Sequence, residues 1–507
     1  MKRSMKFKPR FSVLLCRRIF VWVFISLGFA CTGFPRVLAD PLPNFVIIFT
    51  DDMGWADLGS YGERTIQTPR LDKMAEEGMR FTQFYAQPIC GPSRAAIMTG
   101  CQPMRVAEIG NRKNVHPELH PEEITIAEIL KEKGYVSKCI GKWDLARHSQ
   151  RNFIPHLLPT YQGFDEFFGT PTSNDQLVDL YEGEECVQRD APMATLTKRY
   201  TDSAIEFMRR KQDQPFFIYL PHSMVHTRLA ASADYRGRSE RGLYGDAVEE
   251  LDFQTGRILD EVKRLGLDEK TWVIFTSDNG PWLIKNRDFQ DGELPTDHGG
   301  SAGPLRSGKV STWEGGVRVP CIVRAPGQVP AGQVCHELAS TLDILPTLAN
   351  LAGCALPQDR VLDGEDITPL LQGNFQAANS EKVFLYYLLS HLQAVRKGPW
   401  KLHVARPRHP QWLGRHAVNR HIHPRDDVGM SEPQLYHLID DPGEQNDLAK
   451  EYPSVVEQLL VEAEKARQDI GDYDRIGKNM RFYDPPGKPP LRPQTNFGKS
   501  TLPNQSR

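Results

Sequence analysis

The sequence predicts an α/β protein with a parallel sheet flanked by helices, and two patterns carry that prediction. Short apolar runs, typical of buried strands, alternate with longer helical stretches. Polar residues follow these runs directly, where strands of an open parallel sheet meet a ligand crevice. After about residue 375 the pattern changes to short strands with tight turns, which indicates a smaller α+β region with an antiparallel sheet.

Four apolar runs are predicted as strands of the main sheet, and three stretches between them as helices. The strands are 44–50, 135–140, 215–220 and 271–276. The helices are about 122–133, 197–211 and 245–265. Glycine follows the first and the last of these helices, which is a usual stop signal.

The C-terminal region is predicted from shorter elements. Its strands are 383–388, 393–396, 400–404 and 434–438, and a helix follows at about 453–468. The final residues are rich in proline, lysine and arginine and are expected to form a loosely held tail. The chain is therefore divided into residues 1–39, a larger domain at 40–375 and a C-terminal subdomain with tail at 376–507.

Residues 1–39 have the order of a secretory signal peptide. Basic residues precede an apolar run from Ile19 to Ala30, and Val37-Leu-Ala39 leads up to Asp40. The protein is therefore expected to be exported, to the periplasm or outside the cell, without stable membrane insertion. An uncleaved anchor and lipid attachment at Cys31 stay open, although about 12 apolar residues are few for a membrane span.

The composition excludes one class of partner and leaves disulfides open. A net charge of −2 gives no reason to expect nucleic acid as a partner. Nine cysteines are present without a C-x-x-C pair, so at least one is unpaired or chemically special. Their spacing does not predict which disulfides form.

Two doublets of polar residues follow predicted strands. Asp51-Asp52 comes after the first strand and Asp278-Asn279 after the last. Adjacent carboxylates that face one crevice repel each other, and a divalent cation relieves that repulsion. Oxygen ligands alone favour Ca²⁺ or Mg²⁺ over Zn²⁺. The alternative is turn chemistry, because aspartate and asparagine favour loops after strands.

The segment from Cys90 to Gly100 predicts a helix with a cysteine at its start. Pro92 fits a first helical turn, which places Cys90 at or just before the helix N-terminus, where backbone N–H groups favour anions. Arg94 lies about one turn further on, on the same helix face. The residues thus indicate a reactive cysteine in an anion site. A buried structural cysteine is the alternative.

This segment, Cys90-Gly-Pro-Ser-Arg94 extended to Thr99-Gly100, resembles the signature of the formylglycine-dependent (type I) sulfatases. In that family a separate maturation enzyme oxidises the cysteine to Cα-formylglycine. The resemblance implies an alkaline-phosphatase-like fold, with a mixed sheet flanked by helices. It also implies a sulfatase that acts on a sulfated small molecule or glycan.

The resemblance extends to the metal site and to further polar residues. Asp51, Asp52, Asp278 and Asn279 resemble the family's metal-binding doublets, with the modified Cys90 as the remaining protein ligand. The family's usual ion is Ca²⁺, and Mg²⁺ is less expected. Three more matches lie at Lys142, at His226 in preference to His222, and at Lys309. Residues 435–448 resemble the family's C-terminal subdomain.

The resemblance also implies roles for these residues. A hydrated aldehyde at position 90 would attack sulfur. Arg94, Lys142 and Lys309 would join the metal in supplying positive charge to the sulfate. His226 or Lys309 would give a proton to the leaving alcohol. The substrates would be sulfated carbohydrates or aryl sulfates.

One position departs from the family pattern. Asp144 stands where the family usually has a histidine, the usual base of the final step. An aspartate has an ordinary pKa of about 3.9, against about 6.5 for histidine. Either Asp144 is a weaker base or another group such as His148 takes that role. A third reading is that Asp144 only pairs with a lysine or binds substrate.

Two alternative functions stay open. The first is a phosphonate or phosphate ester hydrolase on the same scaffold, and the second is an inactive protein that binds sulfated glycans.

Residues 405–430 are rich in arginine and histidine. They are expected to form a solvated loop in preference to a basic rim for a sulfated glycan, because Asp426 and Asp427 lie in the same stretch.

Overall fold

The computed structural model describes residues 42–106, 118–147, 151–175, 177–283, 299–388, 390–406 and 429–481. The predicted signal peptide, His148 and most of the basic stretch at 405–430 lie outside these ranges. Among the described residues, no helix is both long enough and apolar enough to cross a membrane.

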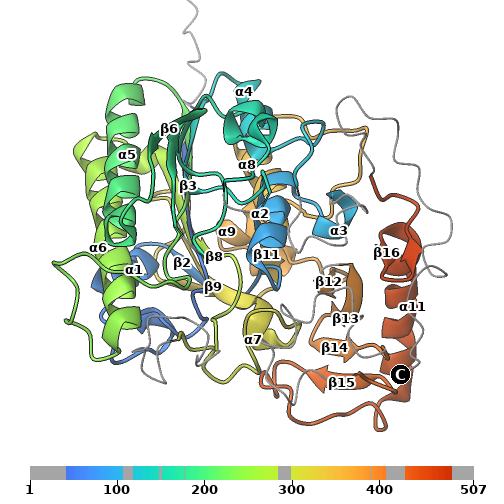
Figure 1. The fold of residues 1–507 in the computed structure, drawn as a ribbon. Helices are drawn as coiled ribbons and strands as arrows, with labels where there is room; N and C mark the ends of the chain where they lie inside the picture. Colours follow the sequence, from blue (N-terminus) through green and yellow to red (C-terminus); the bar gives the residue numbers. More distant parts are fainter. Residues whose placement is uncertain are drawn as a thin grey trace, which may run out of the picture. The chain divides into compact units, whose positions relative to one another are not determined.

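The main structure is a mixed sheet, as predicted (Figure 1). Its strands run in the order β10-β2-β9-β8-β1-β7-β3-β4-β5-β6, and β11 also pairs with β2. The bounds are β1 Asn44–Thr50, β2 Met79–Tyr85, β3 Val136–Lys142, β4 Glu166–Thr170, β5 Leu180–Glu182, β6 Glu185–Gln188, β7 Phe216–Pro221, β8 Thr271–Ser277, β9 Arg318–Arg324, β10 Gln333–Cys335 and β11 Ala339–Ser340.

The four strands predicted from apolar runs are neighbours in the middle of this sheet. They are β8, β1, β7 and β3, and every pair among them that shares hydrogen bonds is parallel. Their carboxyl ends therefore meet at one edge, as expected. The neighbouring β9 runs antiparallel to both β8 and β2, which makes the sheet mixed.

Helices cover both faces of the sheet (Figure 1). One face carries α1, α5 and α6, and the other carries α2, α4, α8 and α9. The bounds are α1 Pro69–Glu76, α2 Cys90–Thr99, α3 Pro103–Val106, α4 Ile126–Lys131, α5 Leu196–Lys211, α6 Gly242–Arg264, α7 Glu314–Val317, α8 Ile344–Leu351 and α9 Thr368–Leu371. Short 3-10 helices lie at 59–61, 155–157, 159–161, 193–195, 268–270, 341–343 and 375–377.

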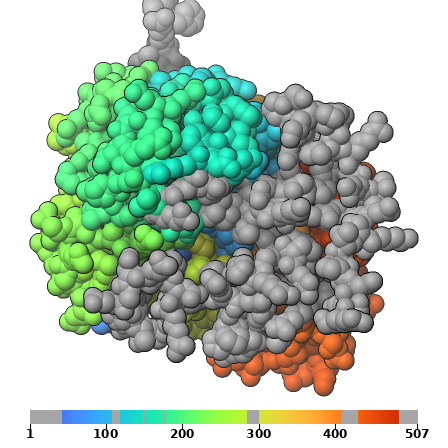
Figure 2. Space-filling view, viewed as in Figure 1, coloured from blue at the N-terminus to red at the C-terminus, as the bar shows by residue number. Residues whose placement is uncertain are grey.

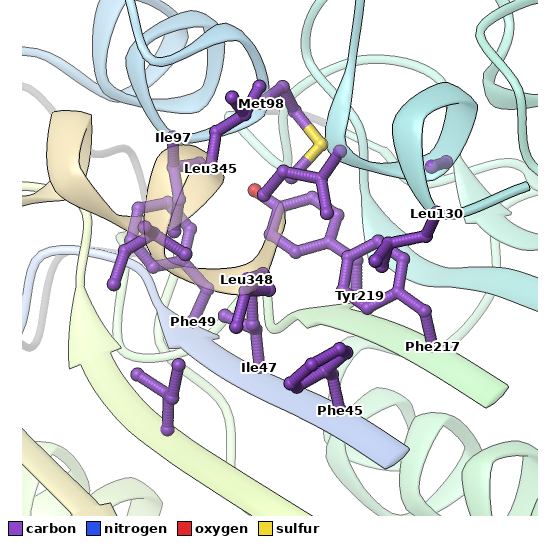
Figure 3. Close-up of a cluster of buried hydrophobic side chains, with 14 of the residues drawn as sticks. Phe45, Ile47, Phe49, Ile97, Met98, Leu130, Phe217, Tyr219, Leu345 and Leu348 are labelled. Atoms are coloured by element: carbon purple, nitrogen blue, oxygen red, sulfur yellow. The ribbon is translucent and has the colours of Figure 1, made fainter. Parts of the chain in front are cut away.

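Strand periodicity sends alternate residues of β1 into the two cores. Phe45, Ile47 and Phe49 pack against α2 and α8 (Figure 3), whereas Val46 and Ile48 face α5 and α6. The whole of β1 is buried. This burial on both faces is the physical reason that the strand reads as an uninterrupted apolar run.

One predicted helix is shorter than the sequence pattern suggested. The stretch expected at about 122–133 forms α4 only from Ile126 to Lys131. Thr125 caps it, because its hydroxyl accepts the N–H of Glu128 while the Glu128 carboxylate accepts the N–H of Thr125. This reciprocal capping box fixes the start of the helix.

The C-terminal region is the predicted antiparallel sheet, in the order β12-β13-β14-β15. The bounds are β12 Val383–Leu388, β13 His391–Lys397, β14 Trp400–His403, β15 Gln434–His437 and α11 Pro453–Asp469, followed by β16 Gly471–Asp472 and β17 Arg475–Ile476. Leu459 of α11 packs on Leu402 and Leu435 of the sheet. In the space-filling view, orange residues of this region lie at one edge of the face, away from the teal and green residues that include α4, α5 and α6 (Figure 2). The boundary between the larger domain and the C-terminal subdomain, between residues 375 and 376, stays a prediction.

Candidate active site

The two polar doublets meet at the carboxyl ends of β1 and β8. The N–H of Asp52 donates to Asp278 Oδ1 over 3.1 Å, and Asn279 Nδ2 donates to Asp52 Oδ1 over 2.7 Å. Asp51 and the other three are all buried. The strand-end argument therefore placed these four side chains together correctly.

Cys90 begins α2 beside these doublets. Ile89 precedes the helix in an extended conformation, and Pro92 lies in the first turn, as predicted. The hydroxyl of Ser93 accepts the N–H of Gln87 and donates to the carbonyl oxygen of Asp278. This bridge ties the helix start to the end of β8.

Burial raises the pKa of the Cys90 thiol well above its ordinary value, although Lys142 and Lys309 act in the opposite direction. Cys90 is only 2% exposed. Burial of the side chain thus disfavours a charged sulfur more than the nearby cations favour it. The reactive group expected at position 90 stays a prediction.

Two buried cations pair with Asp51, and one of them, Arg94, also pairs with Asp278. The Arg94 guanidinium is 2.7 Å from Asp278 Oδ2 and 3.3 Å from Asp51 Oδ2. Lys142 Nζ is 2.7 Å from Asp51 Oδ2, and Arg94 Nη1 donates to the Lys142 carbonyl oxygen over 2.6 Å. Burial alone would raise the pKa of Asp51, but the charges of Lys142, His226 and Arg94 hold it well below its ordinary value.

Asp278 behaves differently from Asp51. Burial and the nearby charge of Asp51 raise the pKa of Asp278 to about 7, although Arg94 acts in the opposite direction. These buried carboxylates therefore repel each other in part, as the sequence argument for a cation assumed.

Lys309 and His226 lie on another side of Asp52. Lys309 Nζ is 2.6 Å from Asp52 Oδ1 and 5.4 Å from the centre of the Trp282 ring. His226 Nε2 is 3.8 Å from Asp52 Oδ2 and 3.5 Å from Asp175 Oδ1. Burial and the charge of Lys309 lower the pKa of His226.

His222 and His226 have different surroundings in the structure. His222 donates its backbone N–H to the Phe49 carbonyl oxygen, and its ring is 6.2 Å from that of Tyr200 on the α5 side. Burial lowers the pKa of His222 to about 3. Only His226 reaches the doublets.

The residues fit a hard divalent cation. Ligand atoms of Asp51, Asp52 and His226 lie within 4.8 Å of one another, a spacing that a single ion could bridge. Asp51 Oδ1, Asp52 Oδ2 and Asn279 Oδ1 are buried without a hydrogen-bond partner. Buried oxygens of this kind are costly unless something binds them. Both oxygens of Asp278 already accept hydrogen bonds, from Asp52 and Arg94.

Asp144 lies near this cluster at the end of β3. Its carboxylate is 3.9 Å from Lys142 Nζ, and its N–H donates to the Pro171 carbonyl oxygen over 3.1 Å. Its φ of 57° is in the left-handed region, which aspartate tolerates better than most residues do. Its negative charge also raises the pKa of the Cys90 thiol. The alternative base, His148, lies outside the described residues.

Sequence reasoning missed two neighbours of the site, Asp175 and Trp282. Asp175 lies in the loop after β4, a strand that the apolar pattern did not reveal, and its side chain is 44% exposed. Trp282 lies three residues after Asn279.

The arrangement suits an anion that carries one charge. Arg94, Lys142 and Lys309 place three positive charges around the start of α2, whose first backbone N–H groups also favour negative charge. Four buried carboxylates, those of Asp51, Asp52, Asp144 and Asp278, face these cations. A bound divalent cation would therefore leave the site with one positive charge in surplus, which matches an ester of one negative charge.

The family comparisons agree with this chemistry. The sulfatase family profile matches residues 43–354, and a profile for the C-terminal region of aryl-sulfatase matches residues 379–497. A third profile, for the C-terminal part of N-sulphoglucosamine sulphohydrolase, matches residues 308–403.

Individual relatives are similar over most of the chain. N-acetylgalactosamine-6-sulfatase of Canis lupus familiaris is 38% identical, over 75% of this chain and 74% of that protein. Steryl-sulfatase of Mus musculus is 34% identical, over 81% of this chain and 79% of that protein. A solved chain from work on the metabolism of multiple glycosaminoglycans by Bacteroides thetaiotaomicron has a TM-score of 0.70 at 27% identity, over 84% of this chain and 99% of that one.

Proposed function

This chain belongs to the sulfatase family and is a sulfuric ester hydrolase, and from that premise we propose that it cleaves sulfate esters of carbohydrates with a formylglycine derived from Cys90, beside a Ca²⁺ ion. One observation carries the proposal. Cys90 starts α2 among Arg94, Lys142 and Lys309, all of them buried. A modified side chain at this position would meet a sulfate anion at the start of a helix and among three cations.

Residues of the site would supply the two groups that the mechanism requires. Asp51, Asp52, Asp278 and Asn279 would hold the cation, which supplies positive charge to the sulfate oxygens. The formylglycine at position 90 supplies, as its hydrate, a hydroxyl nucleophile. In the overall reaction water provides one oxygen of the free sulfate, and the alcohol receives a proton.

The protein's own residues bind the sulfate and move protons. Arg94 and Lys142 hold the sulfate oxygens through fixed positive charge, which is most effective where water is excluded. Lys309 or His226 gives a proton to the leaving oxygen. Both lie beside Trp282, so the carbon skeleton of the alcohol would rest against that ring. Asp144 would accept a proton from the position-90 side chain.

Sulfated carbohydrates are the preferred substrate class because of the relatives' names. The matched proteins include an N-acetylgalactosamine-6-sulfatase and a steryl-sulfatase. A panel of sulfated sugars that differ in sulfate position, with a steryl sulfate and matched aryl sulfate and aryl phosphate esters, tests this. We expect one sulfated sugar to have the highest kcat/KM, and the aryl sulfate to exceed the aryl phosphate by about 10²-fold or more, because a doubly charged phosphate requires more positive charge.

Each alternative predicts another result on that panel. A faster aryl phosphate would identify a phosphate or phosphonate ester hydrolase. Binding of a sulfated sugar by fully modified protein without any turnover would identify a glycan-binding protein. We also propose export, because of the order of residues 1–39. N-terminal sequencing of the mature chain would begin near Asp40.

Replacing Asp144 with alanine is expected to slow the second half of the reaction more than the first. If Asp144 is the final base, the variant releases one equivalent of alcohol in a burst, and steady turnover then falls by about 10²–10⁴-fold. Stopped-flow measurement of alcohol release separates the two phases.

Two further variants identify the role of Asp144. Asp144→Asn keeps the size and the left-handed backbone tolerance but cannot accept the proton, so it should reproduce the burst. Asp144→His restores the residue that the family usually has and should speed turnover near neutral pH. A raised KM without a burst would mean that Asp144 contacts the substrate, and unchanged kinetics in every variant would remove it from catalysis.

A further inference from the structure

The segment from Pro304 to Glu314, which carries Lys309, has a strained backbone. Ser307 and Val310 have φ angles of 63° and 65°. The left-handed region is unfavourable for side chains with a Cβ, and most of all for a β-branched residue such as valine. Residues persist in this conformation only where their surroundings hold them. Contacts outside the segment must therefore fix its shape.

Two of these contacts join the segment to the active site. The Lys309 N–H donates to the Pro281 carbonyl oxygen over 3.0 Å, and the Val310 N–H donates to the Pro88 carbonyl oxygen over 2.8 Å. Pro88 is two residues before Cys90. These bonds set the position of Lys309 relative to both the start of α2 and the end of β8.

The C-terminal sheet holds the other end of the segment. Lys401 Nζ, from β14, donates to the Thr312 carbonyl oxygen over 2.8 Å. The Thr312 hydroxyl donates to Gln393 Oε1 of β13 over 2.8 Å. The Glu314 N–H donates to Glu444 Oε2 over 2.7 Å. Each of these bonds crosses from the main body to the C-terminal region.

A buried charge cluster joins these contacts. Lys401 Nζ lies 3.0 Å from Glu314 Oε1 and 2.8 Å from Glu444 Oε1, and all three side chains are fully buried. Trp313 directly precedes Glu314 in the sequence. Its ring centre lies 3.4 Å from the Arg306 guanidinium carbon and 4.0 Å from the centre of the His403 ring. A buried ammonium between two carboxylates strongly penalises any shift that separates them.

We propose that the C-terminal sheet is part of the catalytic apparatus, because Lys401 and Glu444 position Lys309 through the Pro304–Glu314 segment. The inference rests on the proposed function, in which Lys309 or His226 gives the proton to the leaving oxygen, and it takes Lys309 as that donor. Lys401 contacts no reacting atom. Its ammonium holds the Thr312 carbonyl and Glu314 in place. The strained backbone between Lys309 and Thr312 transmits that position to Lys309.

A double-mutant cycle tests the proposal. Rates are measured for aryl sulfates of increasing leaving-group pKa, in the formylglycine-containing enzyme and its Lys401→Met, Lys309→Ala and doubly substituted forms. Lys401→Met should lower kcat by about 10²-fold on the poorest leaving group, because a displacement of about 1 Å has that cost, and by much less on the best. With Lys309 already replaced, Lys401→Met should lower kcat by less than about 3-fold.

Lys138→Met is the matched control. Lys138 is also a buried lysine paired with a carboxylate, 3.1 Å from Glu166, but it lies on β3 away from the segment. Rates per folded molecule should be unchanged in this variant. If Lys401→Met does not fold, Thr312→Val removes only the hydrogen bond to Gln393, and it should show the same dependence on Lys309 at smaller size.

The results separate failure of the inference from failure of the proposed function. The positioning role is overturned if Lys401→Met lowers kcat by the same factor in the enzyme with Lys309 and in the Lys309→Ala enzyme. It is also overturned if neither Lys401→Met nor Thr312→Val changes kcat. In either case a strong effect of Lys309→Ala would leave the proposed function intact. No effect of Lys309→Ala on the leaving-group dependence would overturn the role of Lys309 at the leaving oxygen and the positioning role with it.

Discussion

Replacing Cys90 with alanine is expected to abolish turnover and to leave the fold intact. Alanine suits the first position of α2, and the site offers little volume for rearrangement because all of α2 is buried. No neighbour can replace the nucleophile that the modified side chain supplies, so kcat should fall by about 10⁴-fold or more. Steady-state rates on the best sulfated sugar, together with circular dichroism, measure both outcomes.

The same experiment requires evidence of the modification. The active enzyme should yield a peptide in which position 90 has lost hydrogen sulfide and gained one oxygen, and it should react with an aminooxy probe. Full activity from protein that contains only unmodified Cys90 would falsify the proposed mechanism.

Cys335→Ala is the matched control for Cys90→Ala. Cys335 is likewise a buried cysteine, and it lies on β10, separated from β1 by β2, β9 and β8. This variant should retain full kcat per folded molecule and should give no change in probe labelling. Loss of activity in both variants would point to a general effect of cysteine removal on the fold.

The sequence predicted most reliably the parts of the fold that are buried on both sides. Residues 44–50 and 271–276 were expected as strands, and β1 and β8, both buried throughout, have these bounds to within one residue. β2 was missed because Arg80 and Gln83 interrupt its apolar pattern. β9 is also buried throughout, but it was missed because it contains Pro320 and has an arginine at each end. Strand direction also depends on the whole topology, so a local pattern could not reveal that β9 is antiparallel.

The residues of the candidate site could likewise be predicted only in part. The doublets were found because each follows an apolar strand, and the end of a strand is visible in sequence. The burial of Cys90 could not be predicted, because it depends on packing by residues far away in the sequence. The contacts of Lys401 with Thr312 and Glu444 join parts of the chain far apart in sequence, and no local pattern signals them.

Removing the divalent cation is expected to have the second largest effect, a fall in kcat/KM of about 10³-fold or more. A cation that polarises the sulfate contributes several kcal/mol to the transition state, and each 1.36 kcal/mol is tenfold in rate. Dialysis against a chelator should inactivate the enzyme, and Ca²⁺ should restore it. Elemental analysis of the active enzyme should find about one Ca²⁺ or Mg²⁺ per chain.

Asp52→Asn is the most specific variant for this site. It keeps the side-chain size, and asparagine tolerates the left-handed backbone that Asp52 adopts, with φ of 61°. It removes one negative charge from the ligand set, so the apparent affinity for Ca²⁺ should fall by about 10–100-fold. Asp278→Ala should lose both metal and activity, because it also removes the carboxylate that pairs with Arg94.

Asp57→Asn is the matched control. Asp57 is a buried carboxylate near the site, but its oxygens already accept hydrogen bonds from Tyr244, Gly54 and Ser301. Its substitution can reduce stability but should leave the metal content per folded chain unchanged.

Thermal unfolding distinguishes loss of the metal from loss of the fold. A ligand that binds only the native state raises Tm as its concentration increases. The unsubstituted enzyme and Asp57→Asn should therefore both gain stability with added Ca²⁺, whereas Asp52→Asn should need about 10–100-fold more Ca²⁺ for the same gain. Stoichiometric Zn²⁺ in active enzyme, or full activity without any metal, would contradict the oxygen-ligand site. An equal response to Ca²⁺ in Asp52→Asn would mean that the orphaned oxygen of Asp52 is not a ligand.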